Sequence, residues 1–135
     1  MFIEKLQNDI GGIDIYLLDQ ILKKRYHSTD RILDAGCGAG RNLKWFYKNA
    51  FTIYGVDNLE SKIDAIQKTY SAQKTHFSVQ DLTSLAFDDA YFHHVICSAV
   101  LHFAQNTTHF THMFTELIRV LKPGGSVFIR MTSNI

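Results

Sequence analysis

Three glycines at alternate positions, Gly36, Gly38 and Gly40, follow directly after the short apolar run 31–34. Glycine has no Cβ, so such a run lets the backbone turn sharply and approach a ligand closely. A helix placed directly after the run would also direct its unpaired N–H groups toward the same crevice. The pattern predicts a ligand-binding loop between a strand and a helix, and a purely local tight turn is the alternative.

Asp57 is a carboxylate at a position that strengthens this interpretation. It ends the β-rich run 51–56 and lies 17 residues after Gly40. The ends of neighbouring parallel strands lie side by side, and a carboxylate there can accept hydrogen bonds from both hydroxyls of a ribose. Ribose binding therefore explains this residue better than a structural role does.

The glycine spacing differs from two common nucleotide-binding loops. The dinucleotide fingerprint requires a third glycine where this sequence has the much larger Arg41. The triphosphate-binding loop requires a Gly-Lys-Ser/Thr ending, which the sequence does not contain. The residues favour a ligand with an adenosine ribose and a short, uncharged or cationic tail.

The periodicity of apolar residues predicts one leading helix followed by alternating strands and helices. Helices are expected over residues 14–26, 43–50, 59–70 and 107–121, with Asp14 as the first N-cap. Strands are expected over 31–34, 51–56, 75–79, 92–97 and 126–131, with a turn over 122–125. Because parallel strands need such crossovers, the fold class is α/β, a doubly wound, mostly parallel sheet with helices on both faces.

The composition narrows the classes of partner. The 135 residues include 14 Lys+Arg and 13 Asp+Glu, and a formal charge of +1 argues against a nucleic-acid or anionic-membrane partner. No apolar run approaches the roughly 18 residues of a membrane span, and charged residues interrupt the N-terminal stretch where a signal peptide would be apolar. Cys37 and Cys97 lack the spacing of a zinc site and cannot form a disulfide framework. A cytoplasmic location is the expectation.

Four segments, taken in order, resemble the motifs of class I S-adenosylmethionine-dependent methyltransferases. Residues 32–40 resemble the glycine-rich first motif, and residues 54–58 resemble the acidic second motif. Residues 79–82 resemble the adenine-contacting third motif, and residues 116–125 resemble the helix end and turn before strand five. The resemblance covers residues 30–131, and four motifs in order are more specific than any one of them.

This resemblance implies a Rossmann-like sheet of strand order 3-2-1-4-5 and S-adenosyl-L-methionine as the cofactor, with S-adenosyl-L-homocysteine as its product. It implies nine cofactor-binding residues: Asp34, Gly36, Gly38, Gly40, Asp57, Asn58, Asp81, Leu82 and Ser98. The first four would surround the methionine part, Asp57 would hold the ribose hydroxyls, and Asn58 would flank the ribose. Asp81 would accept from the adenine amino group, with a turn cap as the alternative role. The Leu82 N–H would donate to a ring nitrogen, and Ser98 would lie near the amino-acid part.

Candidates for catalysis and substrate binding are fewer, because a sulfonium leaving group reduces the need for a catalytic residue. His102, which follows the fourth expected strand, is the candidate general base, and packing beside the cofactor is its alternative role. The family often uses its leading helix as a lid, so Tyr16 and Tyr26 are expected to cover the substrate pocket. Ordinary half-buried packing is the alternative for both tyrosines.

The histidines of the last expected helix raise the question of a metal site. His109, His112 and Glu116 are spaced at i, i+3 and i+7, opposite the apolar stripe of that helix. We expect this face to be solvated and distant from the strand tips, so no metal is expected.

The domain organisation is one unit over residues 1–135, with a helical lid over 1–29 and an α/β core over 30–135. The family normally continues with another helix and two antiparallel strands, so this sequence is expected to be truncated after strand five. Either the chain is a fragment, or a partner such as a second copy in a dimer covers that edge. The functional hypothesis is in-line methyl transfer to a small-molecule acceptor. The alternatives are a non-catalytic cofactor-binding or regulatory module and, against the evidence of Arg41, a nicotinamide-dependent oxidoreductase.

Overall fold

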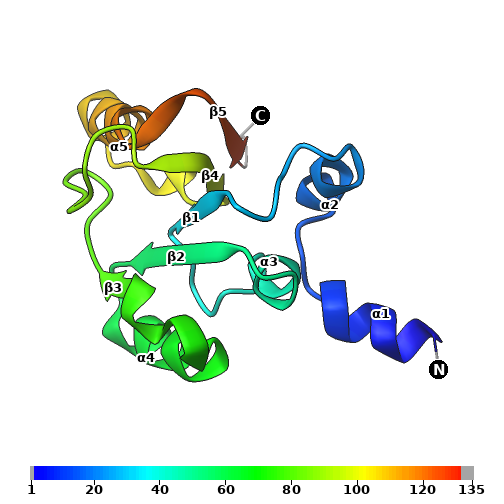
Figure 1. Ribbon diagram of the computed structural model, residues 1–135. Coiled ribbons are helices and arrows are strands. Elements are labelled where there is room, and N and C mark those ends of the chain that lie inside the picture. Colours follow the sequence, from blue (N-terminus) through cyan, green and yellow to red (C-terminus); the bar gives the residue numbers. More distant parts are fainter. Residues whose placement is uncertain (1, 132–135) are drawn as a thin grey trace.

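The computed structural model describes residues 2–131 and contains one parallel sheet with helices packed on it (Figure 1). Its strands, in the spatial order β3-β2-β1-β4-β5, are β1 Arg31–Ala35, β2 Thr52–Asp57, β3 Phe77–Val79, β4 Phe92–Ser98 and β5 Leu121–Arg130. The helices are α1 Phe2–Ile10, α2 Ile15–Leu22, α3 Lys44–Lys48, α4 Glu60–Thr69 and α5 Thr107–Arg119, with short 3₁₀ turns η1 Ser71–His76 and η2 Leu101–Phe103. All neighbouring strands pair in parallel, which confirms the expected fold class and strand order.

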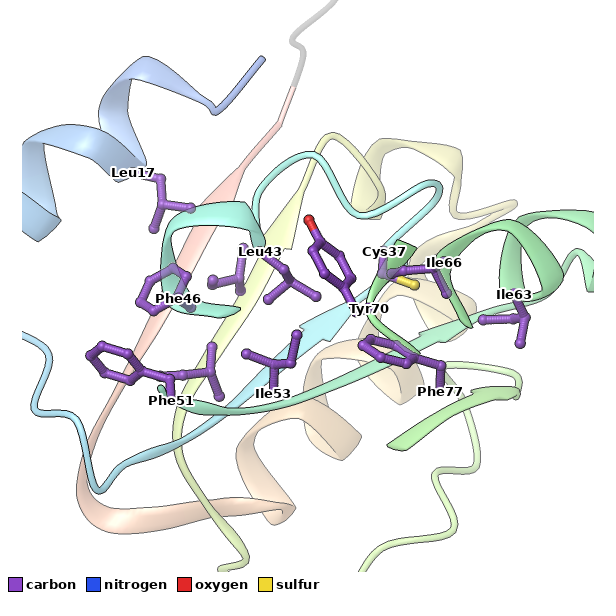
Figure 2. Packing of buried hydrophobic residues seen from close by; sticks show 12 residues of the cluster. Leu17, Cys37, Leu43, Phe46, Phe51, Ile53, Ile63, Ile66, Tyr70 and Phe77 are labelled. Atoms are coloured by element: carbon purple, nitrogen blue, oxygen red, sulfur yellow. The ribbon is translucent and has the colours of Figure 1, made fainter. Parts of the chain in front are cut away.

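Two apolar clusters cover the two faces of the sheet. Adjacent residues of a strand point to opposite faces, so Ile32 of β1 belongs to one cluster and Leu33 to the other. Figure 2 shows the first cluster, in which Leu17 of α2 and Phe46 of α3 pack over the strands beside α4. Met113 of α5 belongs to the second cluster. Burial on both faces explains the continuous apolar stretches within the strands, such as residues 95–97 of β4.

The N-terminal region differs from the single leading helix expected over 14–26. It forms two helices, and α2 ends at Leu22, because Lys24 adopts a left-handed φ of 60° that an α-helix cannot continue through. Asp14 is the N-cap of α2, as expected, and its side chain accepts from the Tyr16 and Leu17 N–H groups. Tyr26 therefore lies beyond the helix on which it was expected.

Strand β5 also differs from its expected start at residue 126. Residues 122–125, expected as a turn, lie inside β5 as an irregularity, because Phe92 pairs with Leu121 whereas His94 pairs with Ser126. A Cβ on Gly125 would meet the His93 carbonyl oxygen at 2.5 Å, which explains the small residue at this bulge. Within residues 2–131, β5 is the edge of the sheet, so a dimer pairing along it stays a prediction.

A helix that spans a membrane is both long and apolar. None of the helices formed by residues 2–131 combines the length and the apolar character of a membrane span.

Candidate functional site

A cavity of about 540 Å³ lies at the carboxyl ends of the strands. The strand order reverses between β1 and β4, because β2 and β3 follow on one side of β1 and β4 and β5 lie on the other, and this is where doubly wound sheets bind ligands. Six of the nine residues expected to bind the cofactor line this cavity: Gly36, Asp57, Asn58, Asp81, Leu82 and Ser98. Segments that lie far apart in the sequence therefore meet at one crevice.

Hydrogen bonds and close packing hold the glycine loop at both of its ends. The N–H groups of Gly36 and Cys37 both donate to the Val56 carbonyl of β2, at 2.8 and 2.9 Å. Gly36 has a φ of 79°, and a Cβ there would meet Val100 Cγ2 at 2.5 Å. At the far end of the loop, the Tyr70 hydroxyl donates to the Gly40 carbonyl at 2.6 Å. Contacts within the protein therefore hold both ends of the loop.

The helix after this loop begins one residue later than the sequence pattern placed it. The chain forms turns over residues 41–43, and α3 begins at Lys44, with Leu43 as its N-cap. None of the described residues of α3 lines the cavity, and an interaction of its N-terminus with a ligand stays a prediction. Gly38 and Gly40 also lie outside the lining, with the Gly40 backbone packed against Ile66 and Tyr70.

Asp57 connects the tip of β2 to the glycine loop. One carboxylate oxygen accepts from the Gly38 N–H and the other from the Leu59 N–H, each at 3.0 Å. Among residues 2–131, no cation forms an ion pair with this carboxylate. Each oxygen has accepting capacity left, so the carboxylate can accept further hydrogen bonds from a ligand in the cavity.

Asp34 lies beneath the loop and is only 2 % exposed. Burial, with a smaller contribution from the charge of Asp57, raises the pKa of its carboxyl to about 7, although Arg41 acts in the opposite direction. No described residue donates a hydrogen bond to this side chain, and it lies outside the cavity lining. A buried carboxyl without a partner suits a position close to a cationic ligand group.

Asp81 and Leu82 form the other end of the cavity. One oxygen of Asp81 accepts from the Thr83 N–H at 2.8 Å and from the Thr83 hydroxyl at 2.6 Å, and these bonds lower the pKa of the Asp81 carboxyl. Asp81 therefore is a turn cap, which was the alternative role. Its second oxygen and the Leu82 N–H have no hydrogen-bond partner within the described chain, so both can bind a ligand.

Ser98 lies at the tip of β4, but its hydroxyl is engaged by the N-terminal segment. It donates to Asp14 at 3.0 Å, and Arg130 donates to the same carboxylate oxygen at 2.9 Å. Burial would raise the pKa of Asp14, but the Arg130 and Ser98 bonds, with the two N-cap bonds, lower it overall. Asp14 thus ties α2 to the tips of β4 and β5, a role that its local N-cap signal does not reveal.

The expected catalytic and substrate residues lie outside the cavity lining. His102 is part of η2, with its ring 4.2 Å from that of Phe103 and a buried Nδ1 that has no partner within the described chain. Tyr16 is 59 % exposed, and the Arg130 guanidinium lies 5.0 Å from the centre of its ring. Tyr26 packs between Phe46 and His94, and burial raises its pKa to about 12. Tyr26 thus occupies the core position given as its alternative.

Helix α5 approaches the strand tips, contrary to the sequence-based expectation. His109 and Met113, one turn apart, line the cavity, together with Gln105 and Phe103 of the preceding segment. The face of α5 that carries His109 is therefore partly a cavity wall. Glu116, further along the helix, accepts from the Leu85 N–H and pairs with Arg119 at 2.6 Å. No three His, Cys, Asp or Glu side chains are grouped for metal binding in the described part of the chain.

Known proteins resemble this chain both in sequence and in architecture. The family described as "Methyltransferase domain" matches residues 33–129. YqeM of Bacillus subtilis, whose name assigns it to the methyltransferases, is 31% identical over 106 residues, which are 77% of this chain and 43% of that protein. The uncharacterized methyltransferase C977.03 of Schizosaccharomyces pombe is 30% identical, over 77% of this chain and 72% of its own length. The PH0226 protein of Pyrococcus horikoshii has the same fold, with a TM-score of 0.74 and 28% identity over 87% of this chain and 56% of its own.

The aligned part is thus less than half of the Bacillus protein and little more than half of the Pyrococcus chain. The matched family segment runs from β1 almost to the end of β5, so it includes every strand of the cavity. S-adenosyl-L-methionine is the cofactor of this class. The chain belongs to the class I S-adenosylmethionine-dependent methyltransferases.

Proposed function

We propose that this chain binds S-adenosyl-L-methionine across the tips of β1 and β2 and transfers its methyl group to a small-molecule acceptor. The observation that carries the proposal is Asp57, an accessible carboxylate at the β2 tip beside the glycine loop. The Asp57 oxygens would accept from the ribose hydroxyls, and Asn58 would flank the sugar. The near-neutral formal charge of +1 supports a small acceptor over a nucleic acid.

The remaining polar groups of the site fit the rest of the cofactor. Asp81 and the Leu82 N–H present one acceptor and one donor, which match the amino group and the adjacent ring nitrogen of adenine. The methionine end would lie over Gly36, and the unpartnered carboxyl of Asp34 suits its cationic ammonium group. Ser98 would lie near the amino-acid part of the cofactor, and its hydroxyl oxygen can accept a bond from that part while the hydroxyl donates to Asp14.

The bound cofactor supplies a methyl group on a positively charged sulfur that leaves without further activation. The protein then works mainly by holding the acceptor in line with the methyl group and excluding water. His102 would accept a proton from an acceptor that carries one, through a ring adjacent in sequence to the cavity-lining Phe103. Tyr16, exposed beside Arg130, would cover the acceptor side.

A cofactor-binding module without catalysis is the second candidate function. It is favoured by the observation that His102, Tyr16 and Tyr26, the candidates for catalysis and substrate binding, do not line the cavity. Production of S-adenosyl-L-homocysteine in the presence of a panel of small acceptors separates the two candidates, because the module would bind the cofactor without turnover.

The decisive binding experiment is calorimetric titration with S-adenosyl-L-homocysteine. Asp57→Ala is expected to weaken binding about 100-fold, because two ribose hydroxyls lose a charged acceptor. Asp64→Ala, which removes an exposed carboxylate from α4, is the matched control and is expected to bind like the wild type. Equal binding by wild type and Asp57→Ala would show that the ribose assignment is wrong.

A further inference from the structure

His109 lies on the first turn of α5 and is directed by the cap of that helix. The Asn106 side chain accepts the His109 N–H at 2.8 Å and so fixes where the helix begins. From this turn, the half-buried His109 side chain lines the same cavity as Asp81 and Leu82. The Asp81 carboxyl, whose pKa is lowered mainly by its bonds to Thr83, is close enough to His109 for the two side chains to interact electrostatically. The imidazole therefore lies at the Asp81 end of the cavity.

The hydrogen bonding of His109 determines which ring nitrogen can donate. The Gln105 N–H donates to Nδ1 at 3.0 Å, so Nδ1 is an acceptor in this arrangement. A neutral imidazole carries one hydrogen, which must then reside on Nε2. No described residue accepts from Nε2, so the cavity wall presents an unused N–H donor.

We propose that His109 donates from Nε2 to N7 of the cofactor's adenine and so contributes to the choice of the purine; this proposal rests on the proposed function above. An adenine amino group is flanked by two ring acceptors, N1 on one side and N7 on the other. With the amino group on Asp81 and N1 on the adjacent Leu82 N–H, N7 is the remaining acceptor beside the amino group, and it is available to a donor from a different element. Three groups from two separate segments then recognise the amino group and the two ring nitrogens on either side of it.

The assignment separates His109 from the other histidine on the same helix. His112 is exposed, and it is not among the residues that line the cavity. Only His109 combines a place in the lining with a fixed tautomer among the histidines of α5. His112→Phe is therefore a matched control for the loss of an imidazole from α5.

The experiment compares the affinities of S-adenosyl-L-homocysteine and its 7-deaza and 3-deaza analogues by calorimetry. In the wild type, the 7-deaza analogue is expected to bind about fivefold more weakly, because one hydrogen bond is lost. His109→Phe is expected to bind S-adenosyl-L-homocysteine and its 7-deaza analogue equally. His109→Gln keeps an N–H donor, so it is expected to regain part of the preference for S-adenosyl-L-homocysteine over the 7-deaza analogue. His112→Phe is expected to behave like the wild type.

Three outcomes would overturn the proposal in distinguishable ways. A wild type that does not bind S-adenosyl-L-homocysteine at all overturns the proposed function itself, and this inference with it. A wild type that binds it but treats the 7-deaza analogue alike overturns only the role of His109. A wild type that binds the 3-deaza analogue more weakly, but not the 7-deaza analogue, shows that N3 is recognised and not N7.

Discussion

One cavity lies at the carboxyl ends of the strands, called here the carboxyl edge, and another lies at their amino ends, called the amino edge. The polar groups of the two cavities are used differently. At the amino edge, a cavity of about 290 Å³ is lined by Asp30 and His94, among others. Asp30 lies 2.7 Å from His94 Nε2 and accepts the His27 N–H, and His94 Nδ1 lies 2.6 Å from the Ser126 hydroxyl. At the carboxyl edge, by contrast, the Asp34 carboxyl, one Asp81 oxygen and the Leu82 N–H have no hydrogen-bond partner among residues 2–131.

Whether polar groups are bonded within the protein distinguishes a structural site from a ligand-binding site more clearly than residue type does. Ser126, His94 and Asp30 are the residue types of a hydrolase triad, yet Ser126 does not line the cavity beside them. Their bonds join β4 and β5 to the segment before β1, and each bonded group satisfies another. The unused donors and acceptors of the carboxyl edge have no such partners within residues 2–131. A ligand can therefore supply the missing partners.

The sharpest test of the comparison is a pair of opposite charge removals. Because burial raises the pKa of Asp34 to about 7, the folded state binds a proton there that the unfolded chain releases near pH 4. Its contribution to stability is therefore full below pH 4 and lost as the pH rises through 7. Asp34→Asn is expected to raise the free energy of unfolding by about 3 kcal/mol at pH 8, and by much less at pH 4. Urea unfolding at both pH values measures this, and a destabilised variant at pH 8 would contradict it.

Asp30→Ala should act in the opposite direction at the amino edge. It leaves the buried His94 without its carboxylate partner, so we expect the free energy of unfolding to fall by about 2 kcal/mol. Binding of S-adenosyl-L-homocysteine is expected to change less than twofold, since this edge is distant from the cofactor site. Asp19→Ala breaks an exposed pair with Lys23 and serves as the control, with a loss of less than about 0.5 kcal/mol. A large loss of binding in Asp30→Ala would show that the two edges are coupled.

The two serines at opposite edges give the smallest expected effects. Ser126→Ala removes the bond to His94, and Ser98→Ala removes the bond to Asp14. Each is expected to cost about 1 kcal/mol of unfolding free energy, measured by urea denaturation. Only Ser98→Ala should also weaken cofactor binding, by about threefold, because only Ser98 lines the carboxyl-edge cavity. If both variants bind the cofactor like the wild type, the role given to Ser98 is limited to positioning α2.

Local patterns in the sequence were sufficient for the sheet and for half of the site. Alternating apolar segments predict the crossovers, and a glycine run with Asp57 at the next strand tip predicts the crevice. The sequence pattern places Tyr26 on the leading helix, because no local residue pattern indicates the positive φ of Lys24 that ends α2. His109 was missed because the position of the first turn of α5 depends on the path of residues 99–106 around η2.

The role of Asp14 shows the same limit on a larger scale. Its cap position is a local signal, but its other partners, Ser98 and Arg130, are 84 and 116 residues away in the sequence. Such bonds exist only once the sheet has brought β4 and β5 side by side. Hydrogen bonds of this kind follow from the complete fold, and a pattern read over a few residues does not contain them.

The contact between Gly36 and Val100 has an evolutionary consequence. Because a methyl group on residue 36 would lie 2.5 Å from Val100 Cγ2, position 36 cannot gain a side chain while Val100 stays in place. A smaller side chain at position 100 would relieve the collision but not the backbone φ of 79° at Gly36, which costs any L-amino acid about 1 kcal/mol or more. Two obstacles of different origin thus protect one glycine, and drift at position 100 alone leaves it unchanged.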